Sequence, residues 1–298
     1  MAATGFVVVR YTAHNWEQMK GYSWQMDWVW VPAAVVTMSV FFLGLAIGWR
    51  SVVAWHDTAL PWNSSLWVWV RSSFTRYLPT PIWAIASRIY LTTQLGVPWR
   101  VAAFSLAGEL VGSIGGAFAI ALLAVSLWFS ISTLFLIAGV VGSVVVILPI
   151  AYSCSLSLTR RFNVLPSCSL YGLAGWSAQY AITFAVFGVA NILVLKSLGF
   201  NVPPINLILG VSALAWAIGT LNVFSPSGLG TREIILALGL GSYLPPPELL
   251  AFGIGSRLAA VFGELFLFSC IYLVKSINQW KASNVTNGSP SFPENISP

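Results

Sequence analysis

The sequence predicts an all-α fold, a polytopic bundle of transmembrane helices, and two observations support this prediction. Of the 298 residues, 57% are hydrophobic and 7% are charged, whereas a soluble domain carries about 25% charged residues. The apolar residues also form long unbroken runs, several of which exceed the roughly 20 residues that cross a bilayer as a helix. A β-barrel would instead show segments of about ten residues with alternating polarity, which this sequence lacks.

The apolar runs divide the chain into expected elements. Six runs are expected to span the membrane, namely residues 28–49, 101–128, 131–158, 171–195, 205–224 and 249–274. Residues 60–78 form a further expected span. Residues 1–27 are expected to be an N-terminal interfacial segment, and residues 276–298, rich in Asn, Ser and Pro, a disordered tail. The integral membrane domain is therefore placed at residues 28–275.

Two stretches are apolar but short and interrupted. Residues 79–97 contain Arg88, and residues 226–244 contain two glycines followed by Arg232 and Glu233. Segments broken by Gly or Pro at matching places in two halves are typical of re-entrant helices that line a transporter site. The sequence therefore predicts about seven crossings plus two re-entrant elements.

The two halves are related by a weak internal repeat. A shift of 148 residues lays residues 98–115 over residues 246–263, with few identities. Two aligned charges reverse their sign, because Arg100 lies over Glu248 and Glu109 lies over Arg257. We expect facing halves to pair Glu109 with Arg257 inside the bundle, and chance placement of charges near helix ends is the alternative.

Charged residues within the apolar runs need an explanation, because each costs about 2.5 to 3.5 kcal/mol on insertion scales. The set comprises Arg88, Glu109, Arg232, Glu233, Arg257 and Glu264. Arg257 and Glu264 lie two turns apart on one helix face and are expected to form a network with Glu109. Together with Glu233, these residues are predicted to hold the interface between the halves or to gate it.

Arg232 follows a break that opens a new helix. Gly228 and Gly230 interrupt the preceding apolar run. Exposed backbone N–H groups, the positive end of the helix dipole and a guanidinium together form an anion site suited to phosphate. The alternative is that Arg232 pairs with Glu233 within its own segment. Arg88 is expected to supply the second cation of the site.

Other residue types argue against several classes of function. The two histidines are His14 and His56, and His56 has no Ser or Cys partner nearby in the sequence. The three cysteines lack the spacing of a metal site, and no Gly-rich nucleotide-binding loop is present. The net charge of +6 is attributed to contact with anionic lipid and not to nucleic acid. We therefore expect neither an enzyme nor a bound metal or cofactor.

The most specific motif is Pro226-Ser227-Gly228-Leu229-Gly230-Thr231-Arg232-Glu233. It resembles a signature of the flippase-like membrane region in lysylphosphatidylglycerol synthetases and their stand-alone relatives, which reads Pro, small, Gly, any, Gly, any, Arg, Glu. Tyr77-Leu78-Pro79, followed by Arg88 and Gly96, resembles the first-half counterpart more loosely, since no Glu follows Arg88. The resemblance covers residues 28–275.

This resemblance implies a multi-pass protein of a prokaryotic inner membrane that moves a phosphate-containing lipid, or a lipid-linked sugar, between leaflets. The implied headgroup site comprises Arg232, Arg88, Gly228 and Gly230. The soluble aminoacyl-transferase domain of the bifunctional members does not follow the last span, so lysyl transfer is not expected. One alternative is a scaffold or regulatory subunit for an envelope glycosyltransferase. Another is an ion-coupled transporter of small anions, in which Glu233 or Glu264 titrates.

Overall fold

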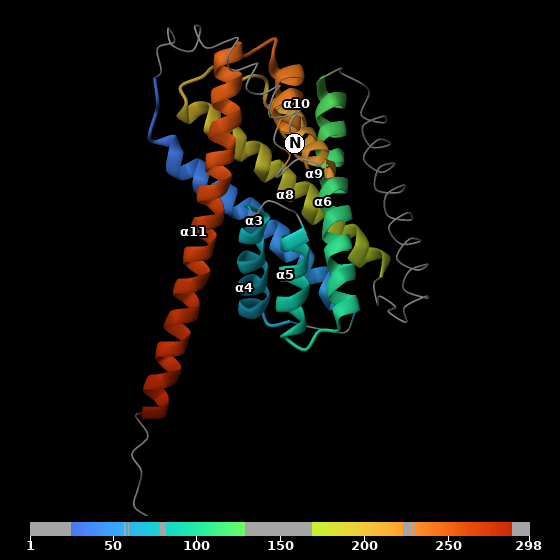
Figure 1. Cartoon of the computed structure of the whole chain (residues 1–298). Helices are drawn as coiled ribbons and strands as arrows, with labels where there is room; N and C mark the ends of the chain where they lie inside the picture. The colour runs from blue at the N-terminus through green and yellow to red at the C-terminus, as the bar shows by residue number, and fades with distance from the viewer. Residues whose placement is uncertain are drawn as a thin grey trace, which may run out of the picture.

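The structure, a computed structural model, describes residues 25–56, 58, 60–77, 82–128, 169–222, 228 and 230–287. Within these residues the chain is helical and contains no strand, so the expected all-α class is confirmed there. The helices are α3 (Trp30–Ala54), α4 (Trp62–Ser73), η1 (Phe74–Tyr77), α5 (Ile82–Thr93), α6 (Trp99–Trp128), α8 (Leu170–Ser197), α9 (Ile205–Leu221), α10 (Thr231–Leu240) and α11 (Pro246–Asn287) (Figure 1). The expected span at residues 131–158 and the predicted segments at residues 1–24 and 288–298 lie outside the described residues.

Four of the described helices are long and apolar enough to cross a membrane. They are Trp30–Ala54, Trp99–Ala124, Tyr171–Ser197 and Pro246–Asn278. At 1.5 Å per residue, a helix of about 25 residues is longer than the roughly 30 Å hydrocarbon core. These helices confirm the spans that were predicted at residues 28–49, 101–128, 171–195 and 249–274.

Two further predicted spans are shorter than expected. Residues 62–77 form the 12-residue helix α4 and the short η1, and 12 residues extend only about 18 Å along a helix. Residues 205–221 form α9, which has 17 residues, and residues 223–224 lie outside the described residues. Local polar groups favour the early end of α4, since the hydroxyls of Ser72 and Ser73 both donate to the carbonyl oxygen of Trp69. α4 alone is therefore too short to cross the hydrocarbon core, whereas α9, with 17 residues, lies at the lower limit for a spanning helix. The crossings expected at these two places stay predictions.

The last helix is longer than expected. α11 continues to Asn287, so residues 276–287 are helical where a disordered tail was predicted from residue 276. Figure 1 shows this end of α11 extending beyond the rest of the bundle.

α3 and α8 cross in antiparallel directions at the centre of the bundle. Just before α3 begins, the amide N–H of Asp27 donates to the carbonyl oxygen of Ser197, at the end of α8, at 2.9 Å. Toward the end of α3, the carbonyl oxygen of Gly48 accepts from the indole N–H of Trp176, near the start of α8, at 3.1 Å. A Cβ atom on Gly48 would overlap the ring of Tyr180. Small residues let membrane helices approach closely, so Gly48 sets the spacing of this crossing.

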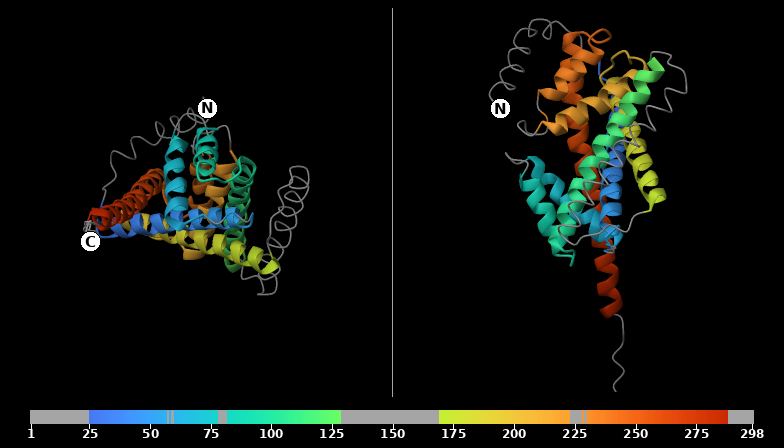
Figure 2. Two further views of the ribbon diagram at one scale, coloured as in Figure 1. Left: turned by 90° about the horizontal axis from the view of Figure 1, so that it is seen from below. Right: turned by 90° about the vertical axis from the view of Figure 1, so that its right-hand side faces the viewer.

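The short helices form two hairpins at opposite ends of the bundle. In Figure 1, α4 and α5 lie toward the lower end, where α3 ends and α6 begins, and α9 and α10 lie toward the upper end. The right-hand view of Figure 2 shows the same separation. α6 runs from the lower to the upper end, and α11 runs the opposite way.

The packing of the helices follows a matched scheme. α4 packs on α5 as α9 packs on α10, and α5 packs on α6 as α10 packs on α11. Likewise α4 contacts α11 while α9 contacts α6, and α3 contacts α6 while α8 contacts α11. Exchanging α3, α4, α5 and α6 for α8, α9, α10 and α11 therefore leaves these contacts unchanged.

Candidate functional site

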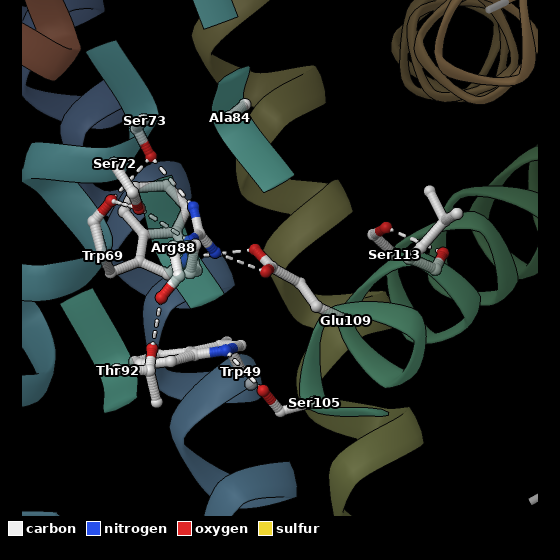
Figure 3. Close-up of polar contacts among 12 residues, drawn as sticks. Trp49, Trp69, Ser72, Ser73, Ala84, Arg88, Thr92, Ser105, Glu109 and Ser113 are labelled. Atoms are coloured by element: carbon white, nitrogen blue, oxygen red, sulfur yellow. Dashed lines mark hydrogen bonds and ion pairs between the residues drawn. The ribbon is translucent and has the colours of Figure 1, made fainter. Parts of the chain in front are cut away.

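Arg88 lies in a buried polar centre between α4, α5 and α6 (Figure 3). Its guanidinium Nε donates to Ser72 Oγ at 2.7 Å, and Nη2 donates to Ser73 Oγ at 3.2 Å. Its Nη1 donates to Glu109 Oε2 at 2.5 Å. Three nitrogens of this guanidinium are therefore bound by the protein itself.

The carboxylate of Glu109 and two tryptophans complete this centre. Trp69 Nε1 donates to Glu109 Oε1 at 2.9 Å, and the Arg88 Cζ atom lies 5.0 Å from the centroid of the Trp69 ring. Trp49 Nε1 donates to Ser105 Oγ at 3.0 Å. The side chains of Arg88 and Glu109 are only 7% and 14% exposed. A buried ion pair is tolerated when further hydrogen bonds satisfy both partners, and here they do.

The second polar site lies where α10 begins. Gly228 and Gly230 have φ angles of +67° and +85°, values that favour glycine. The amide N–H of Gly230 donates to Glu233 Oε2 at 2.8 Å, and Arg257 Nε on α11 donates to Glu233 Oε1 at 2.7 Å. We call Gly228, Gly230, Arg232, Glu233 and Arg257 the arginine–glycine site.

Arg232 reaches the same turn along α9. A Cβ atom on Gly219 would lie 2.6 Å from Arg232 Cγ, and a Cβ atom on Gly228 would lie 2.7 Å from the Gly219 carbonyl oxygen. The Arg232 Cζ atom is 6.0 Å from the ring centroid of Trp216, within range of a cation–π contact. Arg257 Nη2 approaches the Gly228 carbonyl oxygen at 3.4 Å. The turn at Gly228 thus has one arginine contact from α11 and lies against α9 where Arg232 packs.

The sequence profile of the lysylphosphatidylglycerol synthase TM region matches residues 2–267. The chain belongs to this family. Its glycine and arginine motif at α10 had predicted that membership, which is confirmed. No curated protein matches the chain significantly. Family membership and the four apolar helices make the chain a membrane protein of a lipid-related family.

The predicted pairing of Glu109 with Arg257 is wrong. In this family member Glu109 pairs with Arg88, and Arg257 pairs with Glu233. Each long helix packs beside the short helix of its own half, so each charge finds a partner locally. The Glu233 carboxylate, which the alternative assigned to Arg232, binds Arg257 and the Gly230 amide.

The remaining predicted residues are placed as follows. Glu264 is 2% exposed on α11 and belongs to neither of the two ion pairs. The structure does not bring Arg88 together with Arg232, because they lie in separate hairpins. Trp49, Trp69 and the hydroxyls around Arg88 were not predicted as polar partners. In the sequence they are marked only as tryptophan and serine residues within or beside apolar runs, and this does not indicate which polar group each one contacts.

The two polar centres differ in what they are able to bind. The Arg257 and Glu233 side chains are 24% and 23% exposed, well above the values for Arg88 and Glu109. In the part of the chain that the structure describes, no group of three or more His, Cys, Asp or Glu residues could hold a metal ion. The arginine–glycine site offers N–H donors and cations, and such a combination suits an oxyanion.

Proposed function

We propose that this family member is a lipid translocase that moves a phosphate-containing lipid, or a lipid-linked sugar, between the leaflets of a prokaryotic inner membrane. The observation that carries the proposal is the arginine–glycine site. It places Arg257 and Arg232 beside the start of a helix in a chain of which only 7% is charged. A partly exposed cation beside backbone N–H donors is suited to the phosphate of a headgroup.

The packing scheme supports an inverted repeat. α3 and α8 run antiparallel, as do α6 and α11. A two-fold axis that relates antiparallel membrane helices lies in the plane of the membrane, so the hairpins α4–α5 and α9–α10 would enter from opposite faces as re-entrant elements. The shift of 148 residues carries residues 82–93 to 230–241, which overlies α10. It also carries residues 62–73 to 210–221, where α9 ends.

The repeat suggests how a headgroup crosses. Helices of 10 to 12 residues such as α10 and α5 extend about 15 to 18 Å, roughly half the hydrocarbon core. The hairpin tips then lie near the middle of the membrane, as do the sites of transporters built from inverted repeats. The headgroup would bind there while the acyl or prenyl chains stay in lipid.

Arg257 replaces Arg88 as the second cation of this proposed site. Arg88 donates to two hydroxyls and a carboxylate, and its side chain is 7% exposed. Releasing it for a ligand would leave Glu109 buried without its counter-ion, which is costly. Arg257 is more exposed and lies beside the glycine turn.

The test is a fluorescent-lipid leaflet assay in proteoliposomes with anionic and isoprenoid headgroups. We expect wild type to move at least one lipid faster than empty vesicles, and Arg232→Ala and Arg257→Gln to reduce that rate at least tenfold. Arg71→Ala is the matched control, because Arg71 is an exposed arginine on α4, and should keep the wild-type rate.

Three outcomes would contradict the proposal. Lipid movement no faster than in empty vesicles across the panel would refute translocation. A scaffold would keep its partner binding in Arg232→Ala and show no lipid movement in any variant. A small-anion transporter would require a pH gradient and would likewise leave lipids in place.

A further inference from the structure

The anion that occupies the arginine–glycine site in this structure is the protein's own carboxylate. We propose that Glu233 is an internal substitute for the headgroup phosphate, which displaces it from Arg257 and from the start of α10 when the ligand binds. This inference rests on the proposed function, because it names the chemistry by which the same site exchanges its anion.

The donors that hold Glu233 are those that a phosphate would use. One is the Gly230 amide at 2.8 Å, at the N-terminus of α10, and the other is Arg257 Nε at 2.7 Å on α11. The two carboxylate oxygens therefore join two separate helices. Phosphate oxygens accept the same charge-assisted hydrogen bonds and favour the same end of a helix.

Arg257 has capacity for a further anion. A guanidinium carries five N–H donors, and Arg257 makes one short bond to Glu233 and one long contact of 3.4 Å to Gly228. Among the described residues it makes no other hydrogen bond. Its donors can therefore bind an incoming oxyanion before Glu233 has left completely.

The buried polar centre around Arg88 and Glu109 shows why exchange of a carboxylate for phosphate is confined to the arginine–glycine site. Glu109 is bound by Trp69 as well as by Arg88, and both members of that pair are less exposed than Arg257 and Glu233. Separating a desolvated pair is more costly than separating a partly hydrated one. The carboxylate of Glu233 is thus the one of the two that a ligand can replace.

The surroundings of Glu233 keep the donors in place while the carboxylate moves. Asn222 Nδ2 donates to Thr231 Oγ1 at 2.6 Å, which fixes the end of α9 to the start of α10. On α11, one turn before Arg257, a Cβ atom on Gly253 would lie 3.5 Å from Glu233 Cγ. Gly253 therefore presents no side chain that would hold Glu233 in its present position.

The experiment measures binding and not transport. Purified full-length protein in phospholipid-free detergent is titrated with dihexanoyl-phosphatidylglycerol, with inorganic phosphate and with dihexanoylglycerol, which lacks phosphate. Glu233→Gln should bind the phosphatidylglycerol probe and inorganic phosphate about tenfold more tightly than wild type, because the competing charge is gone. Arg257→Gln should bind at least tenfold more weakly. Glu248→Gln, which removes a carboxylate from the start of α11, should match wild type.

A second measurement uses the wild-type chain. If the ligand displaces Glu233, then saturating phosphatidylglycerol probe should raise its modification by a water-soluble carbodiimide severalfold, as read by peptide mass spectrometry. Unchanged or reduced modification would overturn the inference. So would unchanged or weaker affinity in a folded Glu233→Gln variant, or equal affinity for dihexanoylglycerol.

The two proposals fail separately. If the binding pattern holds but no lipid moves in vesicles, translocation is refuted and the anion exchange stands. If lipid moves but Glu233→Gln leaves affinity unchanged, the exchange is refuted and translocation stands.

Discussion

Removing Arg88 should destabilise the protein far more than removing Arg257, although each arginine pairs with one glutamate. The Arg88 and Glu109 side chains are 7% and 14% exposed, so Arg88→Met leaves a buried carboxylate without its counter-ion. Breaking such a pair costs about 3 to 5 kcal/mol. At about 2 to 4 °C per kcal/mol for a chain of this size, Tm should fall by roughly 6 to 20 °C.

The matched change in the second half should have a small effect. The Arg257 and Glu233 side chains are 24% and 23% exposed, and partly hydrated pairs contribute about 1 kcal/mol or less. Arg257→Met should therefore lower Tm by no more than about 4 °C. The assay is thermal unfolding in detergent followed by the fluorescence of the 15 tryptophans.

The double variant Arg88→Met with Glu109→Gln isolates the cause. Neutralising the carboxylate removes the uncompensated charge, so at least half of the lost Tm should return. Three results would refute the reasoning: Arg88→Met melting within about 2 °C of wild type, Arg257→Met costing as much as Arg88→Met, or a double variant no more stable than the single one.

Two further predictions concern the architecture. Gln94 and Ser242 are both exposed and each lies between a short and a long helix. In a chain whose native cysteines have been replaced, Gln94→Cys and Ser242→Cys should react with an impermeant maleimide from opposite sides of the membrane. Reaction of both from the same side would contradict the inverted repeat. Gly48→Val should lower the free energy of unfolding by about 1 to 3 kcal/mol through overpacking, because its Cβ would overlap Tyr180. The control is Gly175→Ala, which has open space around it and should change Tm little. Equal losses of Tm in the two variants would show that the α3–α8 crossing is not tightly packed.

Much of the fold could be predicted because its signals are local. The apolar runs that become α3, α6, α8 and α11 are long enough to read directly, and glycine and proline mark the breaks around α5 and α10. The lengths of α4 and α9 could not be read in this way. Both are apolar enough to resemble spans, yet each helix ends early, α4 near Ser72 and Ser73 and α9 at Asn222.

The sequence by itself determined that this is a helical membrane protein with an interrupted second half and an arginine beside a glycine turn. Hydropathy and glycine content belong to neighbouring residues, and so does the motif that identifies the family. Only the tertiary structure decided which charges meet. Glu109 lies 21 residues from Arg88 and Arg257 lies 24 residues from Glu233, and such pairings depend on which helices pack side by side. The tertiary structure also buries the Arg88–Glu109 pair and leaves the Arg257–Glu233 pair partly exposed, because burial is a property of the assembled bundle.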